Sequence, residues 1–323
     1  MEIILEGKGE LFQKPDIEGF RKFIKEKKNR GFVEKLMDEK EAVEKFVNDG
    51  DYIGFELYGT VRAPMSIVRE IVRQGKKNLR VAGQGLMDVD FLLAADLVES
   101  LDLTYVGYEV FGISPVLRRA CESGKVKVTE WSNAGISWRF KAASMGVPFI
   151  PVRSMLGSDT FNYSAAKVAI CPFTGMKVCL LPALILDVGV IHVHKADVYG
   201  NAIIEGISGF AFEMARASKR LIISAEEIVE TQEIRKYPER VIIPYFLVDA
   251  VVHAPFGSHP GEMVYLYERD EEHLKEMLKK FETPEGTKEY LEEWIYSCKN
   301  HEEYLEKVGT KKLLKLIREK IWR

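Results

Sequence analysis

Apolar residues in the first half of the chain alternate between short continuous runs and stripes of helical spacing. The short runs predict strands over residues 52–56, 79–82, 103–106, 126–129 and 149–152. The stripes predict helices over residues 42–47, 64–72, 90–95, 114–123 and 136–145. Strands that alternate with helices in this way are typical of βαβ units, so we predict an α/β fold. We expect an open, mostly parallel sheet with helices on both of its faces.

The second half of the chain is richer in strands, which we expect over residues 168–171, 178–181, 188–194, 221–224 and 246–252. The run from Val188 to His194 is almost continuously apolar, as in a strand that is buried on both faces. From Asp270 onward the sequence is charged and helical. We therefore expect three parts, which are an N-terminal arm (1–35), an α/β domain (36–269) and a helical C-terminal extension (270–323).

Composition narrows the class of protein. The 323 residues carry 46 Lys and Arg against 49 Asp and Glu, a net charge of −3, and 46% of them are hydrophobic. The hydrophobic fraction supports a sizeable core. The near-neutral charge argues against a nucleic-acid-binding protein, which needs a basic face. No apolar run approaches the roughly 20 residues that span a bilayer, and the charged start resembles no signal peptide. The four cysteines have no CxxC spacing, so we expect reduced thiols in a cytoplasmic protein without nucleic-acid or membrane partners.

Two glycine-containing segments follow predicted strands. Gly83 and Gly85 begin a pattern typical of dinucleotide binding, but Asp88 stands where the third glycine would meet the pyrophosphate. We interpret this segment as a tight backbone loop that lines a cleft. Gly59, Thr60 and Arg62 precede a predicted helix start, where backbone amides and a guanidinium favour an anion. The alternative is an ordinary turn with a surface arginine.

Several histidines and carboxylates invite a metal interpretation. His192 and His194 lie on one face of a predicted strand, and Asp187, Asp197 and His259 are candidates to complete a site. No third ligand has diagnostic spacing, so we expect local hydrogen bonds instead of a metal.

Two glutamates lie close to predicted strand ends. Glu109 and Glu130 stand where a carboxylate can act as a nucleophile or as a general acid or base. Such a residue can equally serve as a helix cap or an ion-pair partner.

Six stretches read together resemble one family, and they lie at residues 49–55, 105–109, 123–132, 142–158, 187–202 and 248–259. In this order they are similar to the α subunits of family I CoA-transferases of the glutaconate type. The resemblance covers about residues 36–318, and it continues into the C-terminal helices through Trp294 and the stretch from His301 to Gly309.

The resemblance implies a reaction and a partner. Such enzymes move CoA between an acyl-CoA and a small carboxylic acid, with a dicarboxylate such as glutaconate as one candidate. The ping-pong reaction passes through a glutamyl-CoA thioester, so CoA thioesters are substrates and no cofactor is bound permanently. The nucleophilic glutamate belongs to a β subunit, within a motif of the type Glu-(Ser/Asn/Ala)-Gly. We find no such motif on a suitable strand of this chain, and Glu285-Gly286 lies in the helical tail and does not fit. We therefore expect a cognate β subunit, in an α2β2 or larger hetero-oligomer, with an apolar contact surface on this chain.

The loops after the strands supply the expected substrate-binding residues. We expect Gly59, Thr60 and Arg62 to hold a carboxylate, and Gly83 and Gly85 to allow close backbone approach. The residues expected to shape the acyl pocket are Tyr108, Glu109, Phe111, Ser132 and Asn133. A further backbone and hydroxyl contact is expected from Gly157 and Ser158.

Two alternative functions stay open. A related branch hydrolyses CoA thioesters and opens a steroid-derived ring, with an acidic α-chain residue where this sequence has Asn133, although Glu109 and Glu130 are close in sequence. The other alternative is a ligand-binding or regulatory protein that keeps the same fold.

Overall fold

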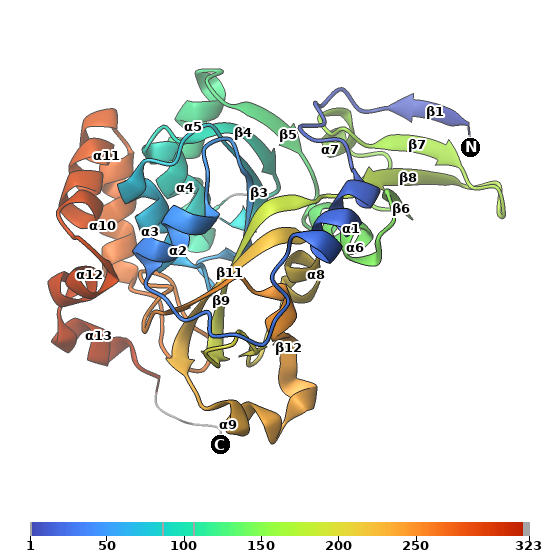
Figure 1. Ribbon diagram of the computed structural model, residues 1–323. Helices are drawn as coiled ribbons and strands as arrows, with labels where there is room; N and C mark the ends of the chain where they lie inside the picture. Colours follow the sequence, from blue (N-terminus) through green and yellow to red (C-terminus); the bar gives the residue numbers. More distant parts are fainter. Residues whose placement is uncertain (1, 86, 106, 319–323) are drawn as a thin grey trace.

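A parallel sheet forms the centre of the computed structural model, which describes residues 2–85, 87–105 and 107–318 (Figure 1). Its parallel strands, in spatial order, are β13 (Ala250–His253), β11 (Ser218–Ile228), β9 (Leu186–Ala196), β2 (Tyr52–Gly59), β3 (Leu79–Gly85), β4 (Val98–Leu103) and β5 (Lys127–Glu130). Two short strands, β10 (Ala202–Ile203) and β12 (Val241–Ile243), continue the sheet in antiparallel fashion beside the end of β9. The predicted mostly parallel sheet is confirmed.

Helices cover both faces of this sheet, as predicted. One face packs against α2 (Glu39–Phe46), α3 (Met65–Gln74), α4 (Met87–Ala94) and α5 (Pro115–Glu122). In the same core, α10 (Glu271–Phe281) packs against α5 and α11 (Pro284–Leu291) packs against α4. The other face packs against α1 (Ile17–Glu26), α6 (Asn133–Met145) and α8 (Ala211–Arg216). Along β11, Ile222 packs in the core on the α3 side, while Leu221 and Ile223 pack in the core on the α6 side. Successive residues of a strand point to opposite faces of the sheet.

Four further short helices are α7 (Asp159–Asn162), α9 (Thr231–Arg235), α12 (His301–Val308) and α13 (Thr310–Leu316). Most of the segment from Glu271 to Leu316 is helical. In the part of the chain that the structure describes, no helix has the length and apolarity needed to cross a membrane.

A second, antiparallel sheet was not predicted from the sequence. It contains β1 (Ile3–Glu6), β7 (Lys167–Ile170), β8 (Lys177–Pro182) and β6 (Phe149–Val152), in that spatial order. We expected residues 149–152 to continue the parallel series. Instead they pair with β8 in antiparallel fashion, with Phe149 opposite Pro182 and Val152 opposite Cys179, and the six-residue turn between β7 and β8 makes those two strands a hairpin. The sheet projects from the body of the molecule (Figure 1).

Two predicted strands are displaced along the sequence. The strand expected at 103–106 is β4, which ends at Leu103, and residue 106 lies outside the described residues. Ser100 and Asp102 on β4 are buried polar residues, so the strand lacks an apolar run. The strand expected at 246–252 begins only at Ala250, because residues 245–247 form a 3₁₀ turn.

A buried carboxylate on β4 connects the sheet to α6. Asp102 accepts hydrogen bonds from the Tyr52 hydroxyl, from Trp131 Nε1 (2.7 Å) and from Arg139 Nη1 (2.8 Å). The Arg139 guanidinium also stacks on the Trp131 ring, 3.9 Å from its centroid, and donates to the Pro182 carbonyl oxygen at the end of β8 (3.1 Å). One charge pair therefore joins the parallel sheet, α6 and the antiparallel sheet.

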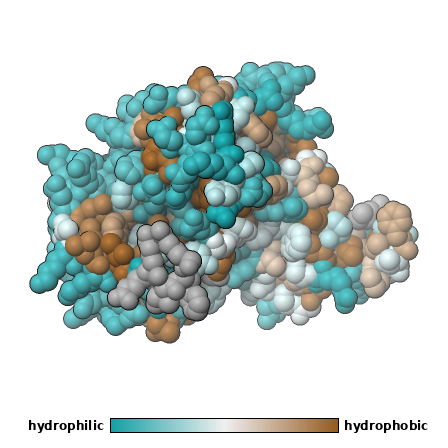
Figure 2. All heavy atoms as spheres, turned by 90° about the horizontal axis from the view of Figure 1, so that it is seen from below, coloured by the Kyte–Doolittle hydropathy of each residue, from teal (hydrophilic) through white to brown (hydrophobic). Residues whose placement is uncertain are grey.

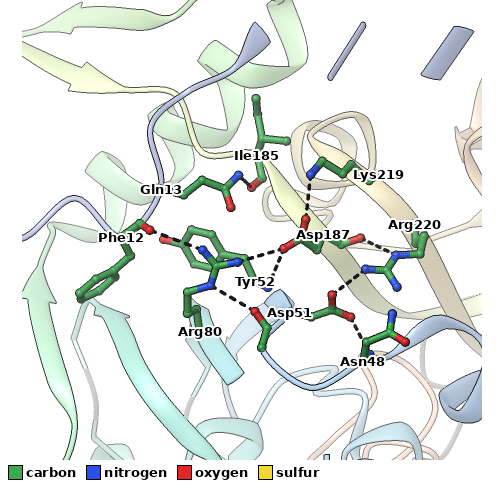
Figure 3. Close-up of polar contacts among 11 residues, drawn as sticks. Phe12, Gln13, Asn48, Asp51, Tyr52, Arg80, Ile185, Asp187, Lys219 and Arg220 are labelled. Carbon is green, nitrogen blue, oxygen red and sulfur yellow. Dashed lines mark hydrogen bonds and ion pairs between the residues drawn. The ribbon is translucent and has the colours of Figure 1, made fainter. Parts of the chain in front are cut away.

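A second cluster of charges lies at the amino-terminal edge of the parallel sheet (Figure 3). Asp187 Oδ1 accepts from Lys219 Nζ (2.8 Å), and Asp187 Oδ2 accepts from Arg80 (3.2 Å) and from the Tyr52 backbone amide (2.9 Å). Burial acts to raise the pKa of Asp187, but the hydrogen bonds from Lys219 and Tyr52 and the positive charges outweigh it, so this pKa is below its ordinary value. Asp187 is neutralised by cations at the starts of the strands and lies away from their carboxyl ends.

The same cluster holds the N-terminal arm against the sheet. Arg80 also donates to the Phe12 carbonyl oxygen (3.4 Å), and Gln13 Nε2 donates to the Ile185 carbonyl oxygen (3.2 Å) (Figure 3). Further along the arm, the ammonium group of Lys28 is buried and lies 2.6 Å from Asp249 Oδ2.

The Asp102–Arg139 pair predicts a large stability effect. Arg139→Met leaves the carboxylate buried without a cation, so we expect the free energy of unfolding to fall by about 3–5 kcal/mol. Lys141→Met removes a more exposed pair with Glu213 (3.0 Å) from the same helix and should cost about 0–1 kcal/mol. Urea denaturation measures both variants. Equal losses would show that the buried pair has no special role.

Candidate functional site

A cleft opens at the carboxyl ends of β4 and β5, the edge at which open parallel sheets bind ligands. It has a volume of about 620 Å³, which suits a small-molecule group. Its lining residues are Leu103, Thr104, Tyr105, Glu130, Trp131, Ser132, Asn133, Ala134 and Thr160. Two larger clefts, of about 850 and 830 Å³, lie near the start of β4 and between α1 and the C-terminal end of α6, away from these strand ends.

The N-terminus of α6 contributes to the lining of the cleft. Ser132 caps this helix, and its hydroxyl oxygen accepts from the Gly135 amide (2.9 Å). Asn133 and Ala134 form the first turn and line the cleft. The first amides of a helix lack helical partners and carry a partial positive charge, so they favour a carboxylate or a polarised carbonyl oxygen.

The walls of the cleft are held by hydrogen bonds to the interior. Trp131 is fixed by its hydrogen bond to Asp102. The Tyr105 backbone amide donates to Asn133 Oδ1 (3.3 Å), which links the loop after β4 to α6. Among the described residues that line the cleft, Glu130 is the sole carboxylate, and none is a lysine or an arginine. The cleft therefore offers polar donors and one negative charge.

Ser132 and Asn133 are the predicted site residues that line this cleft. Gly157 and Ser158 precede α7, which contributes Thr160 to the lining. Gly157 has a φ of 75°, a conformation that favours glycine, and Ser158 Oγ donates to the Met155 carbonyl oxygen (2.8 Å). This loop is a neighbour of the cleft, but neither residue belongs to its lining.

Tyr108, Glu109 and Phe111 were expected to shape the acyl pocket, but they do not line this cleft. Tyr108 is buried and donates its hydroxyl to Asp90 Oδ2 (2.8 Å), and burial and the nearby Asp90 raise its pKa well above the ordinary value. Glu109 is exposed, and Phe111 lies beneath the Arg269 guanidinium, 5.3 Å from its ring centroid.

The predicted glycine loop is part of a strand. Gly83 and Gly85 lie within β3 and not in a loop. The residue between them, Gln84, has a buried side chain and is absent from the lining of the cleft.

The Arg62 side chain is buried and is bound to residues of its own chain. Its Nη2 lies 2.6 Å from Glu56 Oε2, and its Nη1 donates to the His192 carbonyl oxygen (2.7 Å). Burial raises the pKa of Glu56 to about 7, although Arg62 opposes this shift. The surface arginine of the alternative interpretation is wrong, because Arg62 is fully buried. To hold a substrate carboxylate, as predicted, Arg62 would have to open its pair with Glu56.

The two predicted site residues before Arg62 also lie within the fold. Thr60 is buried, and its carbonyl oxygen accepts from the Glu262 amide (3.0 Å). Gly59, with a φ of 64°, ends β2 next to β9. At this point the strand order reverses direction, a position that commonly holds a ligand in open sheets. Here the Arg62 guanidinium fills it.

The histidines of the metal interpretation have local partners. His192 Nδ1 lies 2.8 Å from Ser224 Oγ, and its Nε2 lies 2.7 Å from Glu226 Oε1. His194 Nε2 lies 2.8 Å from the Val264 carbonyl oxygen, and its other ring nitrogen accepts from the Glu205 amide (3.1 Å).

One cluster of potential metal ligands lies beneath the C-terminal helices. His259, Asp270 and His273 bring their ligand atoms within 4.8 Å of one another. However, Lys312 Nζ lies 2.9 Å from Asp270, and both ring nitrogens of His259 have partners, at the Tyr304 hydroxyl (2.7 Å) and Asp270 (3.1 Å). The ammonium group of Lys312 occupies the position beside Asp270 that a cation would need.

Some lining residues were not predicted as site residues. Thr104, Tyr105, Trp131, Ala134 and Thr160 line the cleft, and four of them follow β4 or β5 within four residues. Their nearness to the strand ends was the available signal. For Thr104 and Tyr105, using this signal required the correct end of β4, whereas Trp131 and Ala134 follow β5.

Several known proteins are similar to this chain in sequence. A family model described as Coenzyme A transferase matches residues 36–254. The chain is 34% identical to one subunit of the glutaconate CoA-transferase of Acidaminococcus fermentans, over 88% of this chain and 95% of that protein. It is 33% identical to one subunit of the 3-oxoadipate CoA-transferase of Pseudomonas knackmussii, over 86% and 99%. A cholesterol ring-cleaving hydrolase IpdA subunit of Rhodococcus jostii is 27% identical over 77% and 88%.

A solved structure shares the fold of this chain. The solved structure of glutaconate coenzyme A-transferase from Acidaminococcus fermentans matches with a TM-score of 0.85 and 32% identity, covering 88% of this chain and 96% of that one. The family model covers more than half of the sequence, and the two transferase relatives are matched over nearly their full length. The chain therefore belongs to the coenzyme A transferase family.

Proposed function

We propose that this chain is the α subunit of a heteromeric CoA-transferase that moves CoA between an acyl-CoA and a small carboxylic acid. The observation that carries the proposal is the cleft at the ends of β4 and β5, where the first turn of α6 offers donors to a carboxyl or acyl oxygen. Two relatives at 33–34% identity are named as single subunits of CoA-transferases and match this chain over 95–99% of their length. In this proposal the chain supplies one wall of a shared site.

The proposed reaction uses a glutamate of the partner as its nucleophile. That carboxylate attacks the thioester carbonyl of the donor, the carbon–sulfur bond breaks, and a mixed anhydride forms as CoA thiolate leaves. The thiolate then attacks the glutamyl carbonyl, which releases the donor acid and leaves a glutamyl-CoA thioester. The acceptor acid reverses both steps. The amides at the start of α6 hold the oxygens of the acid, and the cleft orients them.

Exposed apolar side chains near the cleft favour a partner surface at this edge. Tyr105, Val110 and Ile113 lie in the loop after β4, and the side chain of Val110 is 81% exposed. Tyr163 is also exposed, and its carbonyl oxygen accepts from the Glu130 amide (3.1 Å). Apolar and aromatic residues are typical of protein interfaces. In the view of Figure 2, the end of the molecule that carries the antiparallel sheet shows pale and brown residues among hydrophilic ones, and separate brown patches lie elsewhere on this face.

One observation favours hydrolysis of a CoA thioester as a second candidate. Glu130 is half-buried and lines the cleft, so it has the position of a general base that could activate water. A hydrolase releases free CoA without an acceptor acid, which a transferase does not do.

The transferase proposal predicts that activity depends on a partner. We expect no CoA exchange between an acyl-CoA and a free acid with this chain alone, because the proposal places the nucleophile on the partner. Co-expression with a β-type subunit from the same genome should produce a complex with exchange activity, measured by chromatography of the acyl-CoAs. Full exchange by the isolated chain would overturn the proposal, and so would CoA release by the complex in the absence of an acceptor.

The role of Glu130 separates the two candidates. In the complex, we expect Glu130→Gln to keep kcat for CoA exchange within about threefold of wild type, because Glu130 is not the nucleophile. KM for the acid should fall severalfold, since about 1 kcal/mol of like-charge repulsion is removed. Glu109→Gln, outside the cleft, is the matched control and should change neither constant. A loss of about 10²-fold or more in kcat for Glu130→Gln would instead indicate general-base catalysis.

A further inference from the structure

One buried amide reaches from the central sheet to the helix that lines the cleft. Gln84 is the penultimate residue of β3, and its side chain is buried. Its Nε2 donates to two acceptors on α6, the carbonyl oxygen of Asn133 and the hydroxyl of Ser137 (2.9 Å). The amide has two hydrogens and both are used.

These hydrogen bonds act on the part of α6 that lines the cleft. Asn133 is the first residue of the helix, and Ser137 lies one turn later. The Ser137 hydroxyl in turn donates to the same Asn133 carbonyl oxygen (3.0 Å), so the three groups form a closed cluster. Through Asn133 Oδ1, which accepts from the Tyr105 amide, the cluster also reaches the loop after β4. Gln84 thus connects the end of β3 to two walls of the cleft.

The cluster requires an amide at this position. A carboxylate of the same shape has only acceptor oxygens, and it would face the carbonyl oxygen of Asn133 without a proton between them. An apolar side chain would leave the Asn133 carbonyl oxygen and the Ser137 hydroxyl without the donor from β3. Asparagine is one methylene shorter than glutamine, so its amide would not reach α6 in the same way.

We propose that Gln84 is a positioning residue that holds the first turn of α6 in register with the strand ends, so that its donors meet the acyl or carboxyl oxygens of the substrate. The inference rests on the proposed function for its effect on catalysis. Small displacements of positioning groups can cost about 10²-fold in rate. Gln84 does not itself line the cleft, so it acts through α6 and the loop that carries Tyr105.

The test compares Gln84→Leu with Gln74→Leu in the complex with the partner. Gln74, at the end of α3, is a matched control because its Nε2 also bridges two acceptors, the Lys40 carbonyl oxygen (2.9 Å) and Glu70 Oε1 (2.8 Å), at a site that does not line the cleft. We expect Gln84→Leu to lower kcat/KM for the acid by about 10–100-fold, and Gln74→Leu to change it less than about twofold. Hydrogen–deuterium exchange over residues 133–140 should accelerate at least about tenfold in Gln84→Leu alone.

A pH profile supplies a readout that a general loss of packing would not move. Burial raises the pKa of a carboxyl group, and a protonated carboxyl can donate one hydrogen bond. We expect Gln84→Glu to regain activity as the pH falls from about 8 to about 6, while Gln84→Leu shows the profile of the wild-type complex.

The outcomes are separable. Unchanged exchange at residues 133–140, or an unchanged kcat/KM in a folded Gln84→Leu complex, overturns the positioning role. Absence of CoA exchange by the wild-type complex overturns the proposed function, and that result is read from the wild type alone.

Discussion

The region around the cleft depends on the buried carboxylate of Asp102. Removing a carboxylate from water costs several kcal/mol, and the cost is offset only when a cation and well-placed donors surround it. Arg139, Trp131 and the Tyr52 hydroxyl supply those groups. Because Trp131 lines the cleft and Arg139 belongs to the helix whose first turn lines it, the same interaction fixes both walls. The position of α6 is thus set by an ion pair at its middle and by neutral hydrogen bonds at its start.

Charges are distributed unequally between the two edges of the parallel sheet. At the amino-terminal edge, Asp51 and Asp187 are paired with Arg80, Lys219 and Arg220 and hold the arm in place (Figure 3). At the carboxyl edge, the position between β2 and β9 is filled by Arg62 and Glu56. The open cleft is displaced toward β4 and β5, and it is lined by helix donors with one carboxylate. In the proposed function, the partner subunit closes the open side of this cleft.

The sequence was informative where local pattern decides the structure. The alternation of strands and helices, the helix start at Ser114 and the place of Ser132 and Asn133 just after a strand could all be predicted from spacing. The antiparallel sheet was missed because the short strands β6 to β8 have the same apolar pattern in either kind of sheet. β4 was displaced because Asp102 interrupts its apolar pattern, although partners far along the chain bury that residue. The burial of Arg62 was not predicted for a similar reason, since Glu56 and the distant His192 carbonyl oxygen are its partners.

In the proposed mechanism, this chain forms one wall of a site whose nucleophile lies on another chain. A decisive experiment is to mix the complex with an acyl-CoA, reduce the enzyme-bound thioester with borohydride, and map the modified residue by mass spectrometry. We expect the reduced glutamate to lie on the partner, with no peptide of this chain modified. Reduction of Glu130 or Glu109 in this chain would contradict the mechanism.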